Sequence, residues 1–268
     1  MKQFPDLEYP IRQLWLPKPS KRRSGRAADR IRFLVAHDSG NPGSTAAGNV
    51  KYYTNSCNDI SASAHLFVDD REILECLPCL TAAPEKAWHV LYNATEDKRR
   101  YGCHANDAAI GVEYCYGPRI NADEAYRRYV WVLAYLCWKF RLDPAKSIIG
   151  HFVLDPHRKT DPKSGLAASR RTYEQLLLDV PAMYARCTGL DHSDHVLGAE
   201  TGVITARGRV NIRYGEPYRR APARLVGDGT RLRYVARVEG ENIEGNSHWF
   251  CLADGEYCWS GAVNVQPG

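Results

Sequence analysis

Two histidines and an aspartate, His37, His151 and Asp161, each stand at the end of an apolar run or in the loop that follows one. Two imidazoles and a carboxylate suit a tetrahedral zinc ion that keeps one position open for water, as hydrolytic sites do and structural sites do not. Their wide spacing in the chain does not group them by itself, and the sequence has no His-Glu-x-x-His motif. The residues that flank them must therefore decide whether they form one site.

Two further residues carry groups that transfer protons or stabilise anions. Glu113 lies in the apolar run 108–116, where an unpaired carboxylate is costly. It is either one partner of a buried salt bridge or a general base whose pKa is tuned by burial and by a nearby cation. Lys159 is either a surface lysine or the cation that stabilises the oxyanion of a tetrahedral intermediate. His157, in the same loop, either competes for the metal or is an ordinary loop residue.

Strands that end in polar loops must position these residues. The run 30–37 is apolar and partly alternating, and a cluster of turn residues follows it, which predicts a strand with a loop at its carboxyl end. The same reasoning predicts a hairpin and two more strands in this part of the chain, over 64–68 with 72–77, 108–116 and 147–151.

Helices are predicted between these strands. Residues 45–55 form a short one, and 123–140 form the clearest one, because apolar residues recur there at spacings of three and four, with Asp123 as the N-cap. A last helix begins after Thr172, which forms a predicted capping box with Gln175.

Five motifs around these residues occur in the order of one known family. They are Leu34–Gly40, Ser63–Val68, Ala87–His89, Ala109–Cys115, and Ile149–His151 followed by Arg158–Pro162. Together, across residues 31–180, they resemble the motifs of the type 2 N-acetylmuramoyl-L-alanine amidases, a family that includes phage lysozyme-like amidases and peptidoglycan recognition proteins. The resemblance implies an α/β fold with a mixed central sheet flanked by helices, and it implies a Zn²⁺ cofactor.

The resemblance assigns a role to each candidate. It makes His37, His151 and Asp161 the zinc ligands. Asp161 stands where many phage members carry a cysteine and has the form seen in the branch that recycles wall fragments. Glu113 is then the general base that takes a proton from water and passes it to the leaving amine, and Lys159 stabilises the oxyanion.

Three more residues are predicted near the substrate. Trp88 and His89, in the Ala-Trp-His motif, are expected to contact the muramyl or peptide part of it. His65 is placed with them, although its position in an apolar strand also fits a core histidine with a backbone partner.

The C-terminal part has a different pattern. We expect residues 1–187 to form the amidase domain, 188–201 a polar linker, and 202–268 a small all-β module. Five short strands are predicted there, over 203–206, 210–213, 230–238, 249–252 and 257–263. Val210–Arg213, Trp249 and Trp259 with their neighbouring turns resemble a bacterial SH3 domain, which implies a small barrel that binds the cell wall. Residues 238–247 are interpreted as an insertion.

Bulk properties limit the partners. The formal charge is +5, and six cations lie between Lys18 and Arg30, which form either a patch for an anionic polymer or a solvated loop. No nucleic-acid-binding motif accompanies them, and no run of apolar residues is long enough to span a membrane. The first residues lack a secretory signal, so the nine cysteines are expected to be reduced thiols.

Three functions remain open at this stage. The first is an endolysin or autolysin, a monomer that is made in the cytoplasm and acts on wall peptidoglycan after release. The second is a cytosolic amidase that recycles soluble anhydromuramyl peptides, which the form of Asp161 favours. The third is a non-catalytic peptidoglycan-recognition protein, which would require broken zinc ligands.

Overall fold

The computed structural model describes residues 8–188, 201–214, 217–219, 221, 223–252 and 256–266. The chain forms two compact units, Met1–Leu190 and Asp191–Gly268. The predicted linker, 188–201, falls outside the described residues except at its two ends. In the part of the chain that is described, no helix combines the length and the apolarity needed to cross a bilayer.

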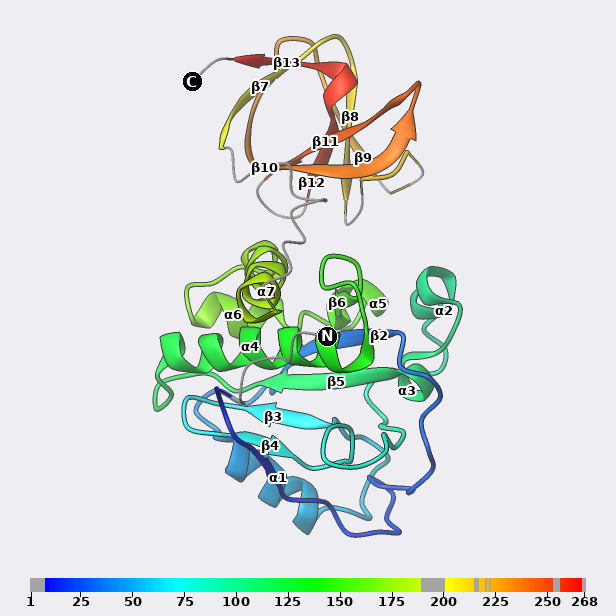
Figure 1. The fold of residues 1–268 in the computed structure, drawn as a ribbon, viewed down its shortest axis with the longest axis vertical. Helices are drawn as coiled ribbons and strands as arrows, with labels where there is room; N and C mark the ends of the chain where they lie inside the picture. The colour runs from blue at the N-terminus through cyan, green and yellow to red at the C-terminus, as the bar shows by residue number, and fades with distance from the viewer. Residues whose placement is uncertain are drawn as a thin grey trace. The chain divides into compact units, whose positions relative to one another are not determined.

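The first unit contains a six-stranded mixed sheet in the order β1-β4-β3-β5-β2-β6 (Figure 1). Only β3 and β4 run antiparallel to each other; the other neighbours are parallel. The strands are β1 (Ile11–Gln13), β2 (Phe33–Asp38), β3 (Leu66–Val68), β4 (Ile73–Glu75), β5 (Ala109–Tyr114) and β6 (Ile148–Gly150). The predicted mixed α/β fold is confirmed, with β1 as a strand that the sequence did not reveal.

Seven helices of the described residues surround this sheet. They are α1 (Ala46–Asn55), α2 (Glu96–Tyr101), α3 (Ala105–Ala108), α4 (Ala122–Phe140), α5 (His151–Leu154), α6 (Lys163–Ala168) and α7 (Tyr173–Thr188). The long helix α4 packs against one face of the sheet, and α7 packs on α4 (Figure 1). On the opposite face, Tyr53 of α1 meets Phe67 of β3 edge-on at 5.1 Å. Because Phe67 pairs with Glu113, this second face is the one that carries Glu113.

Two helix caps differ from their predictions. The N-cap of α4 is Asn121, whose side chain accepts a hydrogen bond from the Glu124 N–H, whereas Asp123 lies in the first turn and pairs with Arg171. Asn and Asp cap almost equally well, so composition alone does not separate the two positions. Thr172 does cap α7, but the Gln175 amide reaches forward to Asp179 instead of back to Thr172.

The basic stretch between Lys18 and Arg30 is not simply a solvated loop. Arg22 is 1% exposed, donates to carbonyls of Ser56 and Ala62, and lies 4.2 Å from the Tyr53 ring centroid. Arg23 is 7% exposed and forms a bidentate ion pair with Glu85 at 2.8 and 2.9 Å. Both arginines therefore attach the N-terminal segment to the domain.

The second unit is a seven-stranded antiparallel sheet, which curves strongly in Figure 1. Its order is β13-β7-β10-β11-β12-β8-β9, and no pairing of described residues joins β9 to β13. The strands are β7 (Gly202–Ala206), β8 (Val210–Tyr214), β9 (Ala223–Val226), β10 (Arg231–Ile243), β11 (Asn246–Leu252), β12 (Glu256–Trp259) and β13 (Val263–Gln266). An SH3-like barrel is thus not confirmed; the described sheet is open.

Most of the residues interpreted as an insertion, 238–247, form strands. These residues extend β10 and β11 into one long hairpin that turns at Glu244 and Gly245, with φ angles of 52° and 86°. Two consecutive positive φ values give the turn a twist that matches antiparallel strands. Trp249, 2% exposed, donates its indole N–H to the Glu241 carbonyl, and Trp259 donates to the Asn246 carbonyl. The indole N–H groups of both tryptophans therefore stabilise this hairpin.

Candidate metal centre

The parallel strands bring the predicted ligands to one edge of the sheet. His37 is paired in register with Glu113 across β2 and β5, so both side chains leave the same face. β6 runs parallel on the other side of β2 with Ala36 opposite Gly150, which places His151 beside His37. Polar groups at the carboxyl ends of neighbouring parallel strands form the usual site of this sheet class.

The three predicted metal ligands converge. Nδ1 of His37 and Nδ1 of His151 lie 2.9 and 3.1 Å from the same carboxylate oxygen, Oδ2 of Asp161. All three ligand atoms lie within 4.8 Å of one another, and both imidazoles are 3% exposed. A tetrahedral zinc ion with bonds of about 2.0–2.1 Å holds its ligand atoms roughly 3.3 Å apart. The donor types, and the distances from each histidine nitrogen to the carboxylate oxygen, therefore fit zinc.

Burial of His37 and hydrogen bonds to Asp161 keep these two groups in the protonation states that a metal ligand requires. Burial lowers the pKa of His37 to about 4, so its imidazole is neutral at pH 7. Burial raises the pKa of Asp161, but hydrogen bonds from His151 and His37 outweigh it and hold that pKa below its ordinary value. Neutral imidazoles and an ionised carboxylate are the forms that bind a divalent metal.

Glu113 and Lys159 lie within electrostatic range of the ligands. Burial, followed by the charges of Asp161 and Asp38, raises the pKa of Glu113 well above its ordinary value, and Lys159 opposes this. Oε2 of Glu113 is buried and has no hydrogen-bond partner among the described residues. A buried orphan carboxylate oxygen is costly, which favours a functional role over the salt bridge. His157 is exposed and does not belong to the ligand group.

His89 lies next to His37. Its Nδ1 is 3.0 Å from Nε2 of His37, and the side chain is 8% exposed. Gly111 of β5 makes room for this ring, because a Cβ at position 111 would lie 2.8 Å from Nδ1 of His89. Hydrogen bonds to the second ring nitrogen orient metal-binding histidines. The substrate contact predicted for His89 thus has an alternative in the structure, namely holding His37.

The other two predicted substrate residues are placed differently from each other. His65 is fully buried; its Nε2–H donates to the Glu85 carbonyl at 2.8 Å and its Nδ1 accepts from the Gly111 N–H at 3.0 Å. No ring nitrogen is left for a substrate, so His65 is a core residue and the substrate role does not fit it. Trp88 is half-buried, and its ring lies 6.3 Å from that of exposed Tyr92.

Two residues that position the site were not singled out in the sequence. The Tyr129 hydroxyl, from α4, donates to the backbone carbonyls of His37 and Val112 at 3.0 and 3.2 Å. Asp38 follows His37 directly, is 7% exposed, and bonds to the start of α6. A polar residue next to a ligand at a strand end is a usable signal for Asp38, whereas Tyr129 reads as part of an apolar helix stripe.

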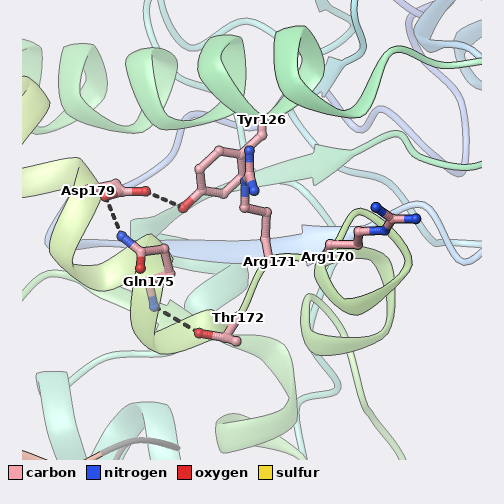
Figure 2. Close-up of a pocket in the computed structure, with 6 residues that line it drawn as sticks. All are labelled: Tyr126, Arg170, Arg171, Thr172, Gln175 and Asp179. Carbon is pink, nitrogen blue, oxygen red and sulfur yellow. Dashed lines mark hydrogen bonds between the residues drawn. The ribbon is translucent and has the colours of Figure 1, made fainter. Parts of the chain in front are cut away.

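A separate cavity of about 340 Å³ shares no residue with the metal centre. Figure 2 shows the Tyr126 and Gln175 side chains directed at Asp179. The Tyr126 hydroxyl and the Gln175 amide each donate to that carboxylate at 2.7 Å. The Tyr126 bond joins α4 to α7, and the Gln175 bond lies within α7, so Asp179 and its partners serve helix packing.

Comparisons with known proteins agree with this geometry. A family profile described as N-acetylmuramoyl-L-alanine amidase matches residues 27–164, half of the chain. The chain is 29% identical over 153 residues to N-acetylmuramoyl-L-alanine amidase BlyA of Bacillus subtilis, a match that covers 52% of this chain but only 38% of BlyA.

Two solved structures share the fold. The catalytic domain of XlyA is 24% identical with a TM-score of 0.52, and the match covers 64% of this chain and 99% of that one. The Staphylococcus aureus hydrolase AmiA is 22% identical with a TM-score of 0.54, and the match covers 68% and 87%. The family profile matches half of the chain, and the three residues that could hold a metal lie together in the structure. The chain therefore belongs to the N-acetylmuramoyl-L-alanine amidase family.

Proposed function

We propose that this protein is a zinc-dependent hydrolase that cleaves the amide bond between N-acetylmuramic acid and the L-alanine of the peptidoglycan stem peptide. The observation that carries the proposal is the convergence of His37, His151 and Asp161 beside the orphan carboxylate of Glu113. BlyA, the relative with the matching segment, is named for this reaction.

Each residue at the centre has a distinct task. A bound zinc ion would polarise the scissile carbonyl and lower the pKa of a water molecule. Glu113 accepts the proton of the attacking water and delivers it to the leaving amine, because Oε2 of its buried carboxylate has no hydrogen-bond partner among the described residues. Lys159 supplies positive charge where the oxyanion develops.

The test is a digestion of purified peptidoglycan by the full chain, first stripped of metal and then given zinc, with products identified by mass spectrometry. We expect stem peptides with a free L-alanine amino terminus, released only after zinc is restored. Stripped protein treated with magnesium is the control. Protein that binds sacculi but releases nothing with zinc would leave a recognition protein.

The C-terminal sheet supports a wall-binding role. We propose that it acts as a bacterial SH3 domain does, because it is a small antiparallel sheet whose longest hairpin is held by two tryptophans. The full chain carrying Glu113→Gln should sediment with intact sacculi without degrading them. If it stays in solution, the wall-binding assignment is wrong.

A solved Bacillus subtilis neighbour is titled an endolysin, which favours cleavage of intact wall after release from the cytoplasm. The form of Asp161 supports a second candidate, the recycling of soluble anhydromuramyl peptides. Rates on intact sacculi and on a soluble anhydromuramyl peptide separate the two. Faster cleavage of the soluble peptide would replace the endolysin proposal.

A further inference from the structure

The carboxylate of Asp38 joins two segments of the first unit that are far apart in sequence. Asp38 is the last residue of β2, directly after His37, and it is 7% exposed. Its Oδ2 accepts hydrogen bonds from the Ser164 hydroxyl and the Gly165 N–H, both at 2.7 Å, and its Oδ1 accepts from the Gly40 N–H at 3.0 Å. Hydrogen bonds to an ionised carboxylate are about twice as strong as neutral ones.

The partners of Asp38 stand at the end of the loop that carries Asp161. Ser164 follows Asp161 by three positions and also lies 3.3 Å from the Thr160 hydroxyl. A Cβ at Gly165 would come within 2.7 Å of the Asp38 Cβ, so the close approach depends on glycine. At the other side, the Phe152 N–H donates to the Asp161 carbonyl at 2.9 Å. The loop is therefore fixed at the backbone of Asp161 and again at the residues three and four positions after it.

We propose that Asp38 is a positioning residue for the metal centre, whose carboxylate fixes the loop bearing Asp161 against the strand bearing His37. It is not itself one of the three converging ligands. His37 and Asp161 thus lie in two segments that the Asp38 carboxylate connects by hydrogen bonds. The distance between His37 and Asp161 therefore depends on Asp38. The inference rests on the proposed zinc site.

Asp69 provides a matched control. It is also a buried carboxylate just after a strand, 1% exposed, and it accepts backbone hydrogen bonds from Ala46, Arg71 and Glu72 at 2.8 to 2.9 Å. Asp69 holds the start of α1, whereas Asp38 holds the start of α6 and, with it, the loop that carries Asp161, which is called the metal loop below. Asp38→Asn and Asp69→Asn therefore remove similar buried acceptors, but only the first touches the metal loop.

The experiment measures zinc affinity by competition with a chromophoric chelator, and the visible absorption of the cobalt-substituted full chain. We expect Asp38→Asn to weaken zinc binding about 10- to 100-fold, the range typical of groups that orient ligands, and to alter the cobalt spectrum. Asp69→Asn should lower the melting temperature but leave zinc affinity and the cobalt spectrum at wild-type values.

Ser164→Ala keeps the experiment decisive if Asp38→Asn fails to fold. Ser164 is exposed, and its loss removes one of the two loop contacts, so zinc affinity should fall by a smaller factor. If Asp38→Asn folds and keeps the zinc affinity and cobalt spectrum of the wild type, the proposal is overturned. If only Ser164→Ala folds, wild-type values in that variant overturn it. An equal loss of zinc affinity in Asp69→Asn overturns it too. Failure of the wild-type chain to bind zinc would overturn the proposed function as well, whereas zinc binding without hydrolysis would overturn only the function.

Discussion

Nε2 of His37 lies 3.0 Å from Nδ1 of His89, while the other nitrogen of the His37 ring faces Asp161. The rings of His65, His89, His37 and His151 follow one another, with centroid distances of 5.9, 5.2 and 4.7 Å. His65 is fixed by backbone groups, so the row leads from the protein core to the metal ligands.

Replacing His89 with alanine should weaken zinc binding about 10- to 100-fold, because the His37 ring loses the hydrogen bond that sets its orientation. Isothermal titration of the metal-free chain with zinc measures this. Val90→Ala is the control, since Val90 is also buried, at 4% exposure, but packs in an apolar cluster. Equal affinity in the His89 and Val90 variants would contradict the positioning role.

Replacing Glu113 with glutamine should reduce kcat about 10²-fold or more while zinc stays bound, because the amide cannot accept a proton. Release of stem peptides from peptidoglycan measures the rate, and metal analysis of the purified variant confirms the zinc content. Glu72→Gln, which alters a surface ion pair with Arg12, should retain full activity. A Glu113 variant as fast as the wild type would remove the general base from the mechanism.

The buried His65 should make stability depend on pH. Burial lowers its pKa from 6.5 to about 4, so between these values the unfolded chain binds a proton that the folded chain does not. Acidification from pH 6.5 toward 4 therefore favours unfolding, and at higher pH this contribution to stability is fully present.

His65→Gln removes that proton linkage. At pH 7 the variant should have a lower free energy of unfolding than the wild type. At pH 5 this difference in the free energy of unfolding should be smaller by about 2 kcal/mol. Urea unfolding of both proteins in a chelator, which excludes metal effects, provides the measurement. A gap that is constant or wider at pH 5 contradicts the assignment of a neutral core imidazole.

Replacing Arg22 with lysine should lower the free energy of unfolding by about 1–3 kcal/mol, because a lysine cannot reproduce the fork that bonds the Ser56 and Ala62 carbonyls. Arg26→Lys, at an exposed position of the same stretch, should change it by less than about 0.5 kcal/mol. Thermal and urea unfolding test the pair. If both substitutions change the free energy of unfolding equally, Arg22 does not have the buried role described above.

The parts of the fold that the sequence predicts best are those with a local signal. The run ending at His37 and the stripe of α4 follow from periodicity, and the grouping of His37, His151 and Asp161 follows from motifs in the order of a known family. Parallel strands then bring their carboxyl ends to one edge, so distant ligands meet without any local spacing rule.

What escaped prediction depends on tertiary contacts. The strand β9, with three of its four residues exposed, has no strong pattern of its own and exists through its pairing with β8. Residues 238–247 were interpreted as an insertion because the stretch is longer than a usual turn, and only the pairing of β10 with β11 shows that it forms a hairpin. The role of His65 likewise required knowledge of which backbone groups surround its ring.

The burial of two arginines reduces the number of cations that this stretch can offer to a charged polymer. Of the six cations between Lys18 and Arg30, Arg22 and Arg23 are withdrawn from solvent, and Glu85 neutralises Arg23. A polyanion that approaches this stretch meets only Lys18, Lys21, Arg26 and Arg30. Adsorption to wall polyanions through this stretch should therefore have the salt sensitivity of four contacts rather than six.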